Sequence, residues 1–132
     1  MRNKNGFTVI ELIVVVIIVG LISAYALVQF AQSMEQSKAQ AAKNNLLGIA
    51  AAQQKYFEDT GAYCTGSCTT TAAINTNLLL SITDTVNYAC AALGSNYSCT
   101  WNDGTDTLTL SVNGAGTGYN VACVSASNNC PS

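Results

Sequence analysis

One acidic side chain, Glu11, lies inside a long apolar segment near the start of the chain. Between Phe7 and Val28 no other residue is expected to carry a charge at neutral pH. A carboxylate inside a membrane-length helix costs about 2.5–3.5 kcal/mol or more unless it has a partner. Because a paired carboxylate can bind a buried cation, we expect Glu11 to have a functional role.

A cation for Glu11 arises if the chain is cut between Gly6 and Phe7, because the cut creates an α-amino group on Phe7. In a bundle of such helices, the amine of one copy could meet the Glu11 carboxylate of its neighbour. Pairing offsets the cost of burying both charges, so that Glu11 would set the register between copies. Thr8 could hydrogen-bond nearby, although a threonine at the start of a helix is usually a cap.

Six cysteines follow the apolar segment, and none lies within it. An even number of cysteines after an export-type N-terminus is typical of disulfides in an oxidising compartment. The sequence leaves their pairing open, and we favour neighbours along the chain: Cys64–Cys68, Cys90–Cys99 and Cys123–Cys130. A thiolate metal site at the first pair is the alternative, but the chain has no histidine to support it.

The remaining residues show no catalytic arrangement. The chain lacks histidine, and we find no nucleophile–base pair, no paired catalytic carboxylates and no phosphate-binding loop. We therefore expect no enzyme and no cofactor. Asp103 and Asp106 could suggest calcium, but two acids in a hairpin turn are more often turn formers, and calcium needs about six to eight oxygen ligands. We expect no bound metal.

Charge also limits the partners. The chain has only 9% charged residues and a net charge of −2. Without residues 1–6, three lysines would face seven acidic residues, a side-chain charge of −4. This balance does not favour nucleic-acid binding. An apolar, weakly charged composition instead suits a subunit that packs among copies of itself.

The apolar segment is long enough to cross a membrane. A helix from Phe7 to Val28 measures roughly 33 Å at about 1.5 Å per residue, and the hydrocarbon core of a bilayer is about 30 Å thick. Arg2 and Lys4 precede it, which places the start in the cytoplasm and the rest outside. We expect a transmembrane helix at residues 7–30.

Two other interpretations of this segment compete. Ala24-Tyr25-Ala26 is a small-x-small site of the type found in cleaved secretory signals. A permanent single-span anchor that never polymerises is the other. Both leave Glu11 unexplained.

Residues 31–132 are expected to form a globular domain that includes a second, amphipathic half of the helix. A helical stripe ends near Thr60-Gly61, where Gly61 suits a C-cap, and residues 61–83 form a connecting region. Segments of period two follow and predict three or four antiparallel strands. The fold class is α+β, a long helix on a small sheet with disulfides. The stripe contains Ala39, Ala42, Leu46, Ile49, Gln53 and Tyr56.

The segment Gly6-Phe7-Thr8-Val9-Ile10-Glu11-Leu12 resembles the class III signal of type IV pilins and pseudopilins, whose pattern is Gly-Phe-Thr-Leu-Ile-Glu-Leu. Val9 is the one departure, and the layout of the whole chain is also pilin-like. The resemblance implies that residues 1–6 are a leader, which a prepilin peptidase removes by cleavage between Gly6 and Phe7, and that Phe7 is N-methylated. It also implies that the helix at residues 7–30 forms a filament core and that Phe7, Thr8 and Glu11 make an assembly contact.

The resulting hypothesis is a structural subunit of a type IV pilus. The precursor would cross the bacterial inner membrane once, surrounded by lipid, and the pilus assembly machinery would extract it into an extracellular homo-oligomeric filament. Adhesion, motility and DNA uptake are possible roles. The alternatives are a periplasmic pseudopilin of a type II secretion system and a membrane-anchored binding module that does not polymerise.

Overall fold

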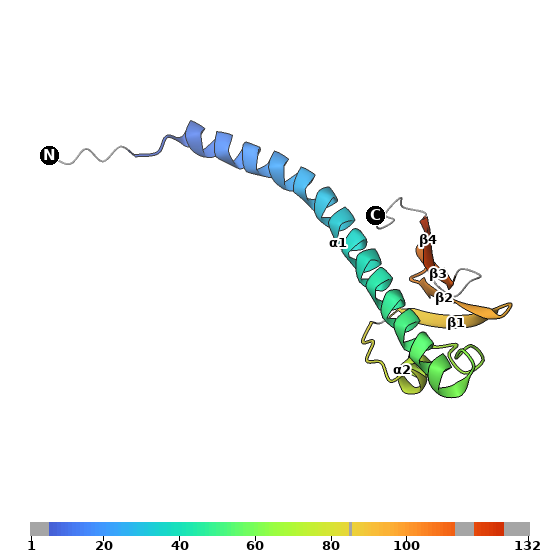
Figure 1. Cartoon of the computed structure of the whole chain (residues 1–132). Coiled ribbons are helices and arrows are strands. Elements are labelled where there is room, and N and C mark those ends of the chain that lie inside the picture. The colour runs from blue at the N-terminus through green and yellow to red at the C-terminus, as the bar shows by residue number, and fades with distance from the viewer. Residues whose placement is uncertain (1–5, 85, 113–117, 126–132) are drawn as a thin grey trace. The chain divides into compact units, whose positions relative to one another are not determined.

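The computed structural model describes residues 6–84, 86–112 and 118–125. The chain divides into two compact units, Met1–Glu35 and Gln36–Ser132, and each is described by itself. The predicted α+β class is confirmed (Figure 1). The elements are helix α1 (Val9–Thr60), helix α2 (Thr71–Asn77), and strands β1 (Asn87–Leu93), β2 (Asn96–Asn102), β3 (Asp106–Val112) and β4 (Tyr119–Ser125).

The first unit consists of the N-terminal part of α1. Every described residue from Phe7 to Phe30 is exposed, although most are large and apolar. By length and composition α1 can cross a membrane. Its many β-branched residues are mediocre helix formers in water, whereas in lipid the backbone must satisfy its own hydrogen bonds. This part of α1 is therefore suited to a lipid environment or to packing against other apolar helices.

In the second unit, α1 packs on a four-stranded antiparallel sheet of order β1-β2-β3-β4 (Figure 1). The predicted helical stripe faces the core, except that Tyr56 is only partly buried. The helix ends at Thr60, and Gly61 follows with a φ of 78° while its N–H donates to the Phe57 carbonyl (2.8 Å). The predicted C-cap at Gly61 is therefore confirmed. The buried residues of α1 are Ala39, Ala42, Leu46, Ile49, Ala50 and Gln53.

The connecting region predicted at residues 61–83 contains a helix, α2, that the sequence analysis did not identify. Thr70 caps it by accepting the N–H of Ala73 (3.2 Å), and Thr71 Oγ1 accepts the N–H of Tyr88 (2.9 Å) on β1. The threonine-rich sequence has low helix propensity. Local capping and contact with β1 therefore decide its conformation.

Two of the expected disulfides are formed, Cys64–Cys68 and Cys90–Cys99. The second joins residues that are paired directly across β1 and β2. The N–H of Cys90 donates to the Cys68 carbonyl (2.8 Å), so the two disulfides are linked through the backbone. Cys130, half of the third expected bridge, lies outside the described residues, and Cys123–Cys130 stays a prediction.

Gln53 fixes the first disulfide loop to α1. Its side chain is completely buried, and its amide group donates to the Cys64 carbonyl (2.7 Å) and accepts the Cys64 N–H (2.8 Å). Both polar atoms of the buried amide are thus satisfied, and so are both backbone groups of Cys64. One side chain therefore holds the loop against the helix.

Two tyrosines lie in the core beside the only tryptophan, Trp101. The Tyr88 hydroxyl accepts from Asn45 (2.9 Å) and donates to Asp84 (3.0 Å), while the Tyr97 hydroxyl donates to the Ala50 carbonyl (3.2 Å). Burial raises the pKa of Tyr88 to about 12, and burial also raises the pKa of Tyr97. Both phenols therefore stay protonated in the folded chain at a pH at which an exposed tyrosine is already ionised.

We expect the fold to lose stability as the pH rises from about 10 to about 12. The pKa of Tyr88 is higher in the folded chain than the ordinary value of 10.0, so its contribution is complete below pH 10 and is lost as the pH approaches 12. Thermal unfolding of the full chain in detergent, followed by Trp101 fluorescence, measures this loss. Tyr88→Phe should weaken the pH dependence of the unfolding midpoint between about pH 10 and 12. The same pH dependence in that variant and in the wild-type chain would show that Tyr88 does not cause it.

Candidate functional site

The candidate site begins with the turn that starts α1. Thr8 precedes the helix, and its Oγ1 accepts the N–H of Glu11 (3.3 Å). Glu11 Oε2 in return accepts both the backbone N–H of Thr8 (2.9 Å) and its hydroxyl (2.8 Å). This is the reciprocal arrangement of a capping box, which satisfies two helix N–H groups that have no partner inside the helix.

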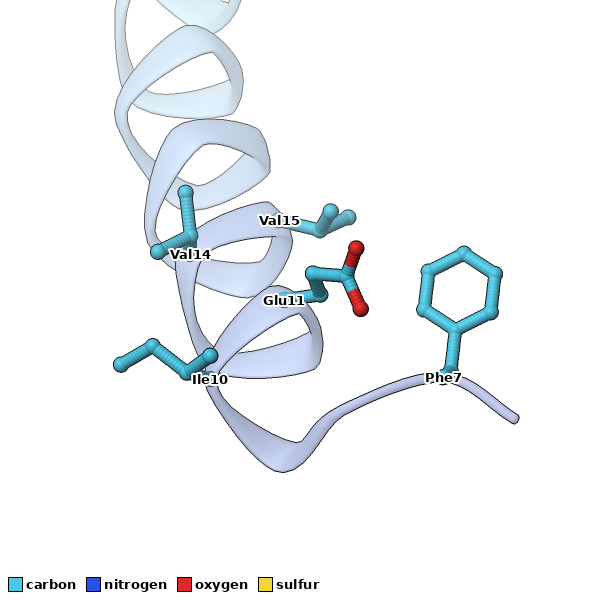
Figure 2. A pocket seen from close by; sticks show the side chains of 5 residues that line it. All are labelled: Phe7, Ile10, Glu11, Val14 and Val15. Atoms are coloured by element: carbon cyan, nitrogen blue, oxygen red, sulfur yellow. The ribbon is translucent and has the colours of Figure 1, made fainter. Parts of the chain in front are cut away.

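A shallow pocket of about 360 Å³ lies next to this cap. It is lined by Phe7, Ile10, Glu11, Val14 and Val15, so the Glu11 carboxylate is the one acidic group on an otherwise apolar wall. Figure 2 shows the Phe7 ring and the Glu11 carboxylate on the same side, with the apolar residues presented by the first turns of α1. The pocket could receive a small cationic group that is attached to an apolar side chain or segment.

The carboxylate has capacity for such a group. Both bonds from Thr8 go to Oε2, and among the described residues no hydrogen bond is made to Oε1. An ionised carboxylate offers about four lone-pair positions. The sequence contains no lysine or arginine from residue 5 to residue 37, so nearby residues along the helix supply no cation. The site can therefore hold its cap and accept an external ammonium group together.

The structure thus brings together all three predicted assembly residues, Phe7, Thr8 and Glu11, at the start of α1. Gly6 is exposed and precedes them outside any helix or strand. The expectation that Thr8 could hydrogen-bond nearby is confirmed, and the structure adds that its bonds with Glu11 are reciprocal. The signal was present, because Thr8-Val9-Ile10-Glu11 matches the pattern of a capping box.

The cysteines lie in the other unit and have a structural role there. Cys64, Cys68, Cys90 and Cys99 are all buried and belong to the core cluster. Buried disulfides in a small domain stabilise it mainly by restricting the unfolded chain. These four cysteines stabilise the fold of the second unit and are not part of the candidate site.

The carboxylates considered for calcium make other contacts. Asp103 Oδ1 accepts the N–H groups of Thr105 (2.9 Å) and Asp106 (2.8 Å), and these backbone bonds hold the pKa of Asp103 below its ordinary value. Asp106 is buried and accepts a hydrogen bond from the Ser125 hydroxyl (2.7 Å). Asp103 thus forms the β2–β3 turn, and Asp106 joins β3 to β4.

Comparison with known proteins places the candidate site inside a defined motif. Residues 1–27 match the family model described as the prokaryotic N-terminal methylation motif, so the chain carries this motif. The similarity to the class III signal is thereby confirmed. The match includes the whole capping box and every residue that lines the pocket.

Two characterised proteins are similar to part of the chain. The chain is 40% identical over 62 residues to the type II secretion system core protein G of Pseudomonas aeruginosa, a match that covers 47% of this chain and 44% of that protein. It is also 40% identical over 62 residues to the type IV major pilin protein PilA of Myxococcus xanthus, which covers 47% of this chain and 28% of that protein. The chain therefore matches less than half the length of either relative. No solved structure matches it.

Proposed function

We propose that this chain is the structural subunit of a type IV pilus, made as a membrane precursor and polymerised through the N-terminal part of α1. The observation that carries the proposal is the capped Glu11 beside Phe7, in an exposed apolar helix that bears the N-terminal methylation motif. The helix cap alone would serve an isolated anchor equally well, whereas a filament also gives the charge of Glu11 a partner.

Each residue of the candidate site then has a role in processing or in assembly. Cleavage after Gly6 by a prepilin peptidase frees the amine of Phe7, which is then methylated. The Phe7 ammonium group of an incoming copy binds Glu11 of a copy already in the filament, while Thr8 keeps the carboxylate oriented through its two bonds. Removal from water strengthens the attraction between the two charges and makes an unpaired Glu11 costly. Only the copy in the correct register satisfies both groups.

A pseudopilin of a type II secretion system is the second candidate. The similarity to core protein G is as high in identity and length as the similarity to PilA. The disulfides favour the pilus, because a filament exposed outside the cell gains most from a covalently stabilised domain. The helix and its site serve the same step in both structures, so the candidates differ in location and not in mechanism.

Mass analysis of the N-terminal peptide tests processing and location together. Filaments are sheared from the surface of cells that produce the chain, and the terminal peptide is compared with that of the cell envelope. We expect a peptide that begins at methylated Phe7 in the sheared fraction. Methylated Phe7 confined to the envelope would favour the pseudopilin, and a start at Leu27 would mean a secreted domain without the helix.

A further inference from the structure

Leu79 has a backbone conformation that leucine rarely adopts. It follows the C-cap of α2 with a φ of 54°, while the N–H of Leu80 donates to the Asn75 carbonyl (3.1 Å) and the N–H of Leu78 to the Ile74 carbonyl (2.9 Å). The Leu78 bond is the last ordinary bond of the helix, and the Leu80 bond is the six-residue bond of a Schellman-type end, in which the left-handed position is usually glycine and sometimes asparagine. A side chain with a Cβ is strained there.

The surrounding residues explain the backbone but not the leucine. Leu78 is buried and Leu80 packs against the core, so the chain must reverse between them. The Asn75 side chain accepts the N–H of Ile82 (3.0 Å) and donates to its carbonyl (2.9 Å), which fixes the turn. Glycine at position 79 would satisfy all of these contacts without strain.

The side chain of Leu79 also gains nothing from the fold. It is 87% exposed, the highest value among the large apolar side chains that the structure describes. A single exposed leucine is ordinary, and so is a single strained turn. The two together at one residue mean that the isolated chain would fold better without this side chain. A strained residue that the fold does not need is a candidate for a contact outside the chain.

The proposed filament supplies the partner, a second copy of this chain, and the charge of the neighbourhood permits the contact. Residues 60–83 contain no charged side chain, and all lysines that follow the apolar segment lie on α1, at Lys38, Lys43 and Lys55. Copies with the same negative net charge repel one another, and a contact at a charged surface must also remove ions from water. The uncharged stretch around Leu79 is a place where two copies can meet without these costs.

We propose that Leu79 is a contact between neighbouring copies, its side chain packing on an apolar surface of a second copy of this chain. The inference rests on the proposed function and deepens it by naming a contact outside the N-terminal helix. Assembly buries the exposed leucine and so compensates for the strained turn. The residue is unfavourable in the single subunit and favourable in the filament.

Two substitutions separate these effects in the full-length chain. Leu79→Gly removes the side chain and the strain, whereas Leu79→Ala removes most of the side chain and keeps the strained Cβ. In detergent, we expect Leu79→Gly to raise the midpoint of Trp101-monitored unfolding by roughly 3–6 °C and Leu79→Ala to leave it within about 2 °C. We expect both to lower the yield of sheared filaments severalfold. Val124→Ala, which trims another highly exposed side chain, should leave both measurements unchanged.

The outcomes are distinct. A lower midpoint for Leu79→Gly would show that the side chain stabilises the single chain, and would overturn the inference. Wild-type filament yield from both Leu79 variants, or an equal loss from Val124→Ala, would overturn it while leaving the proposed function intact. Failure of the wild-type chain to form filaments would overturn the proposed function and this contact with it.

Discussion

Replacing Glu11 with glutamine is expected to reduce filament yield at least about tenfold, although glutamine can keep the hydrogen bonds of the helix cap. A glutamine at this position of a capping box still accepts the backbone N–H of Thr8. It carries no charge, so the Phe7 ammonium group of a neighbouring copy would be buried without a counter-ion. Leaving one partner of a buried ion pair alone costs about 3–5 kcal/mol, and each 1.4 kcal/mol changes an equilibrium about tenfold.

Two further variants separate the cap from the charge. Glu11→Ala removes both and should assemble as poorly as Glu11→Gln, whereas Thr8→Val removes the hydroxyl contacts and keeps the charge. We expect Thr8→Val to retain most of the filament yield. The measurement is the amount of chain in sheared filaments relative to processed chain in the membrane, which separates assembly from cleavage. Wild-type yield from Glu11→Gln combined with a loss in Glu11→Ala would mean that Glu11 acts only as a cap.

The second large effect is expected at Gln53. Gln53→Met keeps the approximate volume of the side chain and removes both hydrogen bonds to Cys64. The buried N–H and carbonyl of Cys64 then have no partner, at a cost of about 2–4 kcal/mol in the free energy of unfolding. For a unit of this size the unfolding midpoint should fall by roughly 10–20 °C.

Gln54→Met is the matched control for this substitution. Gln54 is the next residue of α1 but is exposed, so the same chemical change there should shift the midpoint by no more than about 2 °C. Both variants keep the disulfides and the tryptophan that reports unfolding. Equal midpoints for the two variants would show that the hydrogen bonds from Gln53 do not hold the loop.

The sequence predicted those parts of the fold that follow from regular spacing. The helical stripe through Ala42, Leu46 and Ile49 is buried because residues three and four apart share one side of a helix. Period-two alternation likewise placed Tyr97 and Trp101 on the inner face of β2. Spacing alone does not decide the edges of the stripe, because the apolar residues Leu47 and Phe57, which flank it on α1, are exposed.

Features that depend on single hydrogen bonds were not predicted. Helix α2 forms through a Thr70 cap in a sequence of low helix propensity. In the apolar run Leu78-Leu79-Leu80, the outer two residues attach the region to the core and Leu79 is exposed, a difference that composition does not show. In the candidate site, the sequence alone identified Glu11, because it is the one acidic residue in a long apolar segment. The pattern Thr8-Val9-Ile10-Glu11 indicates reciprocal bonds between Thr8 and Glu11, and the structure shows that both form.

The position of the lysines on α1 has a consequence for digestion by proteases. Enzymes of the trypsin type cut after lysine or arginine, and the chain has neither beyond Lys55. The four strands and both observed disulfides therefore lie in a single fragment that such enzymes cannot shorten. Every cleavage point after the leader lies on one helix, and helical backbone must unwind locally before a protease can bind it. A subunit of this kind resists such enzymes in two ways. Its fold is stable, and its lysines all lie on one helix.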